Sequence, residues 1–555
     1  MSHYAHAEYY LQVLNEVNQL YRQGGDYVNK AIRQLEEEWG QIERGQLWSA
    51  SQAPHDDAAA QLCEDYADLG ADILMLTKDV DKLMRWSTTA LSAAQRLGLS
   101  TAESAHLGNL GIIHRNRGLF LQARMYFEQA LNLARELGDI RLIGTWAGNL
   151  AGVLLEEGDV DQPIQLLNVA LEFARQTGDK RLEATWLGNF GLAYSFGGKL
   201  EQAQIYYMDA LEVQYLVGDK RAQGQTLGNI GNVYAEQEKY DEALKAYMLA
   251  LDIAQELGDI SSEGKWLGNI AGIYSAKGDY KTAVLHHSKA LKLHRTIGDL
   301  AALRTELNNL GGALRVLGEY DHAEACYLEL LQINESVNDK RGQIVALQGL
   351  GLLTRSTSRI HEAKMCFEYA LRLAKDLQDV DQEGILLGYL GTLYYELADY
   401  TKSLELHNQA LQIARTKNDL AALAMHLGNL ANALNALGRV EDCIACAQQA
   451  LTMHQTLHQQ RMVGATMGIL GNAYFSLRRY GDALRHYEDA MIIAVNVGDQ
   501  LNAAHWNANL GYTLTALNQK QQAWQHFLRA EEFYGMLMLT DQVVTIREAR
   551  QSLGL

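Results

Sequence analysis

Hydrophobic positions along the chain recur at the three- and four-residue spacings of amphipathic helices, and this pattern itself repeats every 40 residues. In one such stretch, Leu227, Ile230 and Tyr234 share a face of a first helix, while Tyr247 and Leu251 share a face of a second. Because a single pair of helices leaves apolar surface uncovered, neighbouring units have to stack on it. The pattern therefore predicts an array of helix-turn-helix repeats.

Three short motifs keep these repeats in register. Leu-Gly-Asn stands at 107–109, 187–189, 227–229, 267–269 and 427–429. Gly-Asp stands at 138–139, 178–179, 218–219, 258–259, 298–299 and 498–499. Ala-Leu stands at 130–131, 170–171, 210–211, 250–251, 290–291, 370–371, 410–411 and 450–451. The Gly-Asp pair predicts a left-handed helix end followed by the N-cap of the next helix.

The unbroken period predicts the fold class and the division of the chain. We expect an all-α protein, a right-handed superhelical α-solenoid of helix-turn-helix repeats. About twelve 40-residue repeats fill residues 58–540. Residues 1–57 are expected to form an N-terminal helical capping or adaptor segment, and residues 541–555 a C-terminal capping helix.

Individual repeats resemble a known family. The strings GNVYAEQEKYDEALKAYMLAL (231–251) and GIYSAKGDYKTAVLHHSKAL (272–291) resemble tetratricopeptide repeats. The 40-residue length and the recurring Leu-Gly-Asn resemble the longer repeats of kinesin light chain and of Pins-type polarity scaffolds. This resemblance spans about 480 of the 555 residues. It implies a protein-protein interaction scaffold.

The first 57 residues leave two interpretations open. The string HAEYYLQVLNEVNQLY and the later LEEEWGQIERGQLWSA resemble the segment that joins the ATPase core to the repeat arm in bacterial STAND-type signalling proteins. That resemblance implies an alternative function, a regulatory sensor arm that passes ligand binding to an effector. The other interpretation is a degenerate pair of capping helices that covers the open apolar side of the first repeat.

An asparagine occupies the same first-helix position in eight repeats, and we call this column the asparagine ladder. Its members are Asn109, Asn149, Asn189, Asn229, Asn269, Asn309, Asn429 and Asn509. At about 100° per residue, this position points away from the packed stripe, with Gln225, Asn232 and Glu236 on the same side. First helices line the inner wall of tetratricopeptide arrays, so the resemblance implies that the ladder faces a groove.

The ladder predicts a peptide-binding site. An asparagine offers both a donor and an acceptor to a peptide main chain. The resemblance to kinesin light chain and Pins-type scaffolds implies the same use. A glycine precedes six of these asparagines, at 108, 148, 188, 228, 268 and 428, and glycine also stands at the corresponding positions 388 and 468. Its missing Cβ is expected to let a ligand backbone come close. The alternative is that both residue types serve packing. The ladder fails at Gly349, Tyr389 and Ile469, so the N-terminal half is expected to be the better groove.

A column of tryptophans accompanies the ladder. Trp146, Trp186, Trp266 and Trp506 stand three residues before their asparagines. Aromatic residues at groove edges often anchor ligands. At a 40-residue spacing, however, we expect these side chains to pack between repeats.

Composition limits the partners. The formal net charge of −19 disfavours nucleic acid and favours basic or amphipathic protein partners. The sequence has no apolar run long enough to predict a membrane span, and its start lacks the basic-then-apolar pattern of a secretory signal. Five cysteines fit a reducing compartment. We therefore expect a cytoplasmic protein. Self-association by end-to-end stacking of the repeats is a further option.

Sequence motifs for chemistry are missing. The sequence has no GxxxxGK[ST] or HExxH motif. Cys443 and Cys446 form a single CxxC at packing positions of a helix, and His454 and His458 lack a third ligand and are expected to be a surface pair. We therefore expect no enzymatic activity, no cofactor and no metal.

Overall fold

The computed structural model describes residues 2–23, 26–76 and 80–554, and all the regular secondary structure in these ranges is α-helical. The chain divides into two compact units, residues 1–277 and residues 278–555, and each is described by itself. The all-helical class and the consecutive helix pairs predicted from the sequence are confirmed.

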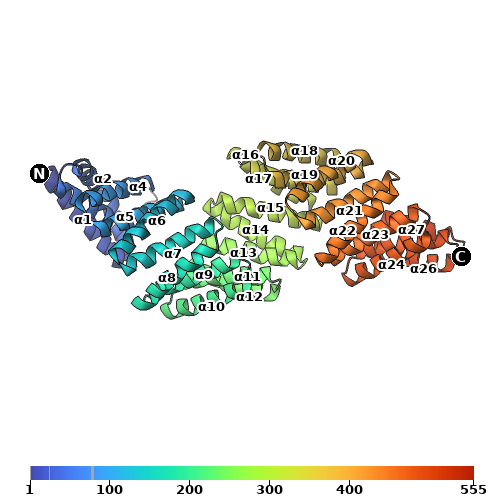
Figure 1. Cartoon of the computed structure of the whole chain (residues 1–555), viewed down its shortest axis with the longest axis horizontal. Helices are drawn as coiled ribbons and strands as arrows, with labels where there is room; N and C mark the ends of the chain where they lie inside the picture. The colour runs from blue at the N-terminus through green and yellow to red at the C-terminus, as the bar shows by residue number, and fades with distance from the viewer. Residues whose placement is uncertain (1, 24–25, 77–79, 555) are drawn as a thin grey trace. The chain divides into compact units, whose positions relative to one another are not determined.

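The first unit contains thirteen described helices, which follow one another in chain order (Figure 1). They are α1 (His3–Gln23), α2 (Asp26–Gln52), α3 (Asp57–Leu76), α4 (Val80–Leu97), α5 (Ser100–Asn116), α6 (Phe120–Leu137), α7 (Ile140–Glu156), α8 (Asp161–Thr177), α9 (Lys180–Phe196), α10 (Leu200–Val217), α11 (Lys220–Glu236), α12 (Tyr240–Leu257) and α13 (Ile260–Ala276).

The second unit continues the same alternation. Its helices are α14 (Tyr280–Ile297), α15 (Leu300–Leu317), α16 (Tyr320–Ser336), α17 (Lys340–Ser356), α18 (Ile360–Asp376), α19 (Val380–Glu396), α20 (Tyr400–Thr416), α21 (Leu420–Ala436), α22 (Val440–Thr456), α23 (Gln460–Ser476), α24 (Tyr480–Asn496), α25 (Gln500–Ala516), α26 (Lys520–Met536) and α27 (Thr540–Gln551).

Helix ends follow the chemistry of the Gly-Asp pairs. Gly258 ends α12 with φ of 63°, and the side chain of Asp259 accepts a hydrogen bond of 3.1 Å from the Ser262 backbone N–H at the start of α13. A second turn, between the two helices of one repeat, often carries a glycine with positive φ, such as Gly278. Two repeats that lack this glycine keep a positive φ there, because Ser358 and Ala398 adopt φ of 60° and 59°. A non-glycine residue in this left-handed conformation costs roughly 1–2 kcal/mol. These turns are therefore locally strained.

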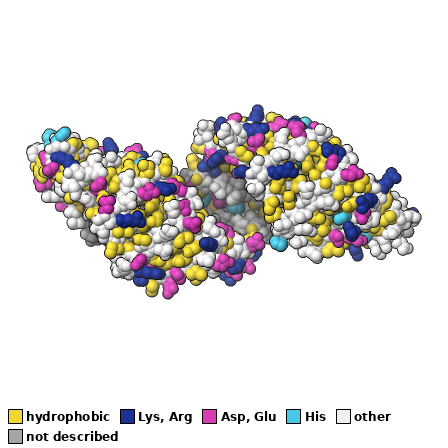
Figure 2. All heavy atoms as spheres, in the orientation of Figure 1, with side chains coloured by type: hydrophobic (Ala, Val, Ile, Leu, Met, Phe, Trp, Pro, Cys, Tyr) yellow, Lys and Arg dark blue, Asp and Glu magenta, His cyan; other side chains and the backbone are white. Residues whose placement is uncertain are grey.

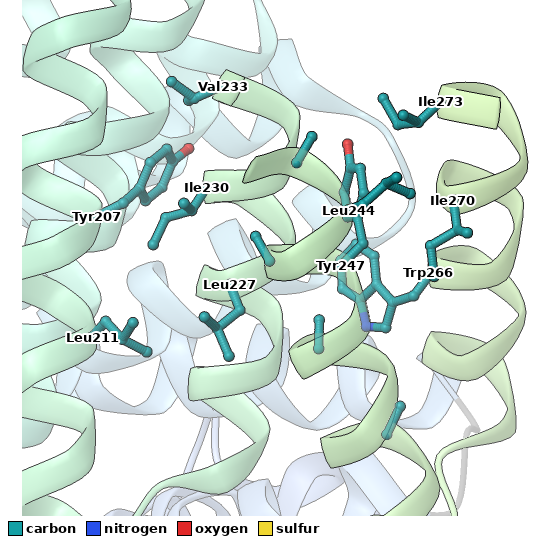
Figure 3. Packing of buried hydrophobic residues seen from close by; sticks show 14 of the residues in the cluster. Tyr207, Leu211, Leu227, Ile230, Val233, Leu244, Tyr247, Trp266, Ile270 and Ile273 are labelled. Atoms are coloured by element: carbon teal, nitrogen blue, oxygen red, sulfur yellow. The ribbon is translucent and has the colours of Figure 1, made fainter. Parts of the chain in front are cut away.

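The hydrophobic core runs through the repeats without closing on any one of them. Tyr247 of α12 packs over Gly231 of its own repeat, and in Figure 3 its ring lies beside Trp266 of the next repeat. The rings of Tyr247 and Trp266 stack with centroids 6.3 Å apart. Each repeat thus supplies one half of an apolar contact that its neighbour completes, as the pattern of the sequence requires.

Residues at the start of the chain join the same core. The Tyr66 hydroxyl of α3 donates a hydrogen bond of 2.7 Å to the Ala7 carbonyl of α1, and the rings of Trp39 in α2 and Trp86 in α4 stack 5.9 Å apart. At the other end, Ile546 of α27 is buried against α26. The capping roles of residues 1–57 and 541–555 stay a prediction.

Successive first helices contact one another more than successive second helices do. In the described part of the first unit, α5, α7, α9 and α11 form a series in which each contacts the next, while α6, α8, α10 and α12 do not to a comparable extent. Stacked helix pairs that are closer on one side curve toward that side. The first helices therefore line the inner side of this stack.

Candidate functional site

The asparagine ladder lies on the solvent-accessible face of the first helices. In the first unit, its members come from the middle of α5, α7, α9, α11 and α13, and in the second unit from α15, α21 and α25. Seven of the eight side chains are half-buried, and Asn309 is exposed. None of these carboxamides is sealed within the helical stack.

Three ladder side chains are free to bind. Asn109, Asn189 and Asn429 have no hydrogen-bond partner among the residues that the structure describes. Asn229 accepts a single long bond of 3.4 Å from the side chain of Gln225, one turn earlier. Each of these carboxamides keeps a donor and an acceptor for a guest.

Asn149 is engaged by its own surroundings. Its Nδ2 donates a hydrogen bond of 2.9 Å to the Thr145 carbonyl, and its Oδ1 accepts one of 3.3 Å from Arg115 of the preceding repeat. A ligand would have to compete with Arg115 for this oxygen.

A tyrosine and a second asparagine hold the ladder residue Asn269. Asn232 Oδ1 accepts hydrogen bonds from the Tyr247 hydroxyl at 2.7 Å and from Asn269 Nδ2 at 3.3 Å. Burial raises the pKa of Tyr247 to about 12, so the hydroxyl keeps its proton and donates. The amide group of Asn232 and the carbonyl oxygen of Asn269 remain available.

The same arrangement recurs in the second unit. Asn472 Oδ1 accepts from the Tyr487 hydroxyl at 2.7 Å and from Asn509 Nδ2 at 3.1 Å. The sequence interpretation missed Asn472, although it stands at the same repeat position as Asn232. The 40-residue period could have found it.

Hollows in the second unit lie beside these residues. One of about 600 Å³ and another of about 420 Å³ share Asn472, Asn509 and Tyr512 in their walls. Asn509 therefore lies in the walls of both hollows. This placement fits a residue that contacts a bound chain.

A third hollow lies where the ladder is interrupted. It measures about 540 Å³ and lies between α19 and α21, with Tyr389, Asn429 and Ile413 of α20 in its walls. Ile385 and Met425, one turn before these ladder positions, are both exposed. Where Tyr389 replaces asparagine, the inner face thus becomes more apolar.

Packing explains the other two interruptions. At Gly349, a Cβ atom would lie 2.3 Å from the ring of Tyr327, so a side chain does not fit there. Ile469 packs in the cluster formed by α21, α22 and α23. Its Cδ1 atom would lie 4.0 Å from a Cβ atom added at Gly428. At both positions, the residue contacts a neighbouring repeat.

The role expected for the glycines before the ladder is wrong at most positions. A Cβ added at Gly108, Gly148, Gly228 or Gly468 would lie 2.0–2.3 Å from a tryptophan ring atom of the next repeat. At Gly388 it would lie 2.8 Å from His426, which replaces the tryptophan there. The missing Cβ makes room for the neighbouring ring and not for a ligand backbone.

The tryptophans have the structural role expected for them. Trp146, Trp186, Trp266 and Trp506 are 8% exposed or less, and each lies between its own first helix and the preceding repeat. The Trp146 Nε1–H donates a hydrogen bond of 3.1 Å to the Ser104 hydroxyl of the preceding first helix. These side chains join repeats and are not accessible to a ligand.

Two cysteine thiols are kept protonated by their surroundings. Burial raises the pKa of Cys326 to about 11 and that of Cys443 to about 12, so both thiols stay protonated. Within the described ranges, no three histidine, cysteine or acidic side chains gather as metal ligands. The expected surface pair is wrong for His454, which is buried and bonded to Gln459 at 2.7 Å, whereas His458 is exposed.

The described helices contain none that is long and apolar enough to cross a membrane.

Comparison with known proteins identifies the repeat. A family model of the tetratricopeptide repeat matches residues 142–215, 223–296, 302–376 and 419–491, and a second model of the same repeat matches residues 104–137. No curated protein matches the sequence.

Several solved structures are similar to parts of the chain. A STAND protein with a tetratricopeptide repeat sensor from Pyrococcus horikoshii is 14% identical and covers 76% of this chain and 67% of its own, with a TM-score of 0.46. The apo quorum sensor NprR from B. thuringiensis is 16% identical, covers 66% and 97%, and has a TM-score of 0.44. BtubC from P. vanneervenii is 21% identical, covers 40% and 92%, and has a TM-score of 0.37.

Proposed function

Because this chain belongs to the tetratricopeptide repeat family, we propose that it is a non-enzymatic scaffold that holds an extended peptide segment of another protein along the asparagine ladder. Arrays of this family present long concave surfaces on which partner proteins bind. In this chain the inner side of the stack carries carboxamides at a regular interval. A peptide main chain presents amide donors and acceptors at regular intervals as well.

One observation carries this proposal. The carboxamides of Asn109, Asn189 and Asn429 reach solvent and have no partner among the described residues. Asparagine in the interior of a helix costs roughly 0.5 kcal/mol relative to alanine. Since these asparagines form no hydrogen bond within the described part of the protein that would offset this cost, a hydrogen bond to a bound ligand explains why they recur.

The experiment uses peptides selected from a random library on the intact protein. The test variant carries Asn189→Ala, Asn229→Ala and Asn269→Ala together. Since each lost hydrogen bond is worth about 1 kcal/mol, and about 1.4 kcal/mol is a factor of ten, binding should weaken on the order of 100-fold.

A matched control separates the groove from general effects of the substitution. Asn132→Ala and Asn168→Ala remove exposed asparagines from α6 and α8, which are second helices and lie outside the ladder. These changes should leave the affinity for the selected peptides as it is. Equal binding by the ladder variant, with its helical content preserved, would mean that the peptides bind elsewhere.

A second function, a regulatory sensor arm, is favoured by one observation. Tyr9 of α1 and Leu47 of α2 are 52% and 49% exposed, on the segment expected to cap the array or to join an effector. Replacing both with glutamine should leave peptide affinity unchanged. Loss of a partner captured by the wild-type protein would support the sensor, and retention of every partner would support the scaffold.

A further inference from the structure

The outward face of α10 is unusually apolar for a helix of this array. Ile205, Met208, Tyr215 and Leu216 are 60%, 50%, 58% and 75% exposed. At about 100° per residue, these side chains fall along one side of the helix, opposite the buried Tyr207 and its neighbours. Figure 2 shows that hydrophobic side chains reach the surface in many places, so single exposed residues carry little weight. Four along one helix form a stripe.

Neighbouring repeats show that the architecture does not need this stripe. At the positions of Tyr215 and Leu216, α8 carries Arg175 and Gln176. At the same positions, α12 carries Gln255 and Glu256. Since the sister helices stack with polar residues at these two positions, Tyr215 and Leu216 of α10 serve something other than the stacking of repeats.

Acidic side chains flank the stripe. Glu201, Asp209 and Glu212 are exposed on the same side of α10, and none forms an ion pair among the described residues. The helix itself contains no lysine or arginine. The stripe therefore combines apolar surface with uncompensated negative charge, and its complement is apolar surface flanked by positive charge.

We propose that the outward face of α10 is a second docking surface, separate from the asparagine ladder, and that it takes a basic amphipathic helix of a partner protein. Apolar side chains of that helix at three- and four-residue spacing would contact Ile205, Met208 and Leu216. Its lysine or arginine side chains would lie beside Asp209 and Glu212. The burial of apolar area supplies the affinity, and the charges set the orientation.

Charge also argues against a second copy of this chain as the occupant. A symmetric contact through α10 would bring Glu201, Asp209 and Glu212 of one copy toward the same three carboxylates of the other. Each copy has a formal net charge of −19, which adds to the repulsion. A basic partner would be attracted to these carboxylates, whereas a second copy would be repelled by them.

The probe is a fluorescent peptide of about 18 residues, or five helical turns, made only of leucine and lysine with helical periodicity. A control peptide has the same composition with leucine and lysine alternating, which gives a strand pattern and the same charge. Fluorescence anisotropy measures the binding of both to the full chain. The helical peptide should bind at least about tenfold more tightly than the control.

The test variant carries Tyr215→Arg and Leu216→Gln, the residues that α8 has at these positions. Because the same residues are already present in a folded sister helix, the fold should be kept, and the circular dichroism spectrum checks it. We expect this variant to bind the helical peptide about tenfold more weakly than the wild type. Asn189→Ala with Asn229→Ala, in the ladder, should bind it as the wild type does.

Three results would overturn the proposal. Equal binding of the helical peptide by the wild type and by the Tyr215→Arg, Leu216→Gln variant would show that the stripe is not the contact. A dimer of the wild type that dissociates in this variant would identify a second copy as the occupant. Loss of binding in the ladder variant alone would place the peptide in the groove.

Discussion

Gly228 is the position at which one added methyl group tests how the repeats are joined. A Cβ there would lie 2.0, 2.3 and 2.6 Å from three ring atoms of Trp266, whereas ordinary contacts begin near 3.4 Å. The Trp266 ring is 1% exposed and stacks on Tyr247, so it has little room to move away. Gly228→Ala therefore forces two neighbouring repeats apart.

The expected magnitude follows from two opposing effects. Overpacking a well-packed core costs typically 1–3 kcal/mol, and an overlap this deep belongs near 3. Alanine in a helix interior is about 1 kcal/mol better than glycine. The net loss of unfolding free energy for Gly228→Ala is thus about 2 kcal/mol.

The preceding repeat provides a control with the opposite sign. Gly188 occupies the same position in α9, but the next repeat carries Thr226 in place of tryptophan, and nothing lies within 4 Å of an added Cβ. Gly188→Ala should raise the unfolding free energy by about 1 kcal/mol, since only the helix preference acts. Two identical substitutions 40 residues apart should therefore differ by about 3 kcal/mol.

Hydrogen exchange is the assay, because a repeat array does not unfold as a single two-state unit. Amide protection in α11 and α13 should fall in Gly228→Ala, while protection in α9 should rise in Gly188→Ala. In a Trp266→Thr background, Gly228→Ala should become stabilising, which gives a coupling energy of about 3 kcal/mol. Stabilisation by Gly228→Ala in the wild-type background would refute the close approach of the tryptophan.

Three further predictions concern stability. Burial, together with the neighbouring His426, lowers the pKa of His407 to about 3 from the ordinary value of 6.5, so the unfolded chain binds a proton that the folded chain does not, and stability falls as the pH drops from 6.5 toward 3. His407→Phe removes this loss, and its advantage over the wild type should grow by about 2 kcal/mol between pH 6.5 and pH 5 in denaturant titrations. Ser358→Gly relieves a φ of 60° and should raise the denaturation midpoint, by up to about 1 kcal/mol in unfolding free energy, whereas an unchanged midpoint would mean the turn is unstrained. Asp259→Ala removes the N-cap of α13 and should cost about 1 kcal/mol, seen as faster hydrogen exchange at Ser262.

The sequence was sufficient to predict the repeats because their signals are local and periodic. The positive φ of Gly258 and the N-cap of Asp259 both follow from a dipeptide, and the stacking of Tyr247 against the next repeat follows from apolar spacing. Each of these features depends on residues close in sequence or one period apart. Because the period is fixed, a contact between neighbouring repeats can be predicted from residues 40 positions apart.

The site was harder to predict, because a helical face has two kinds of neighbour. The direction of Asn229 could be worked out from helix geometry, but the Trp266 ring that fills the space above Gly228 comes from another repeat. Nor does the spacing show which ladder residues are tethered, since that depends on the side chain at a different position, such as Asn232 beside Asn269. Whether a ladder residue or its neighbouring glycine serves packing or binding therefore depends on which side chain of the adjacent repeat lies against it.

The central claim, that the ladder grips the main chain of a peptide, is tested most directly by methylating the backbone of a bound peptide. Peptides selected on the wild-type protein would be synthesised with a single N-methyl group at each successive residue, which removes one amide donor and leaves every side chain in place. The ladder predicts a loss of about fivefold at regularly spaced residues, each loss being absent in a variant that lacks the facing asparagine. Affinity that withstands methylation at every residue and falls only when side chains are cut back would contradict it.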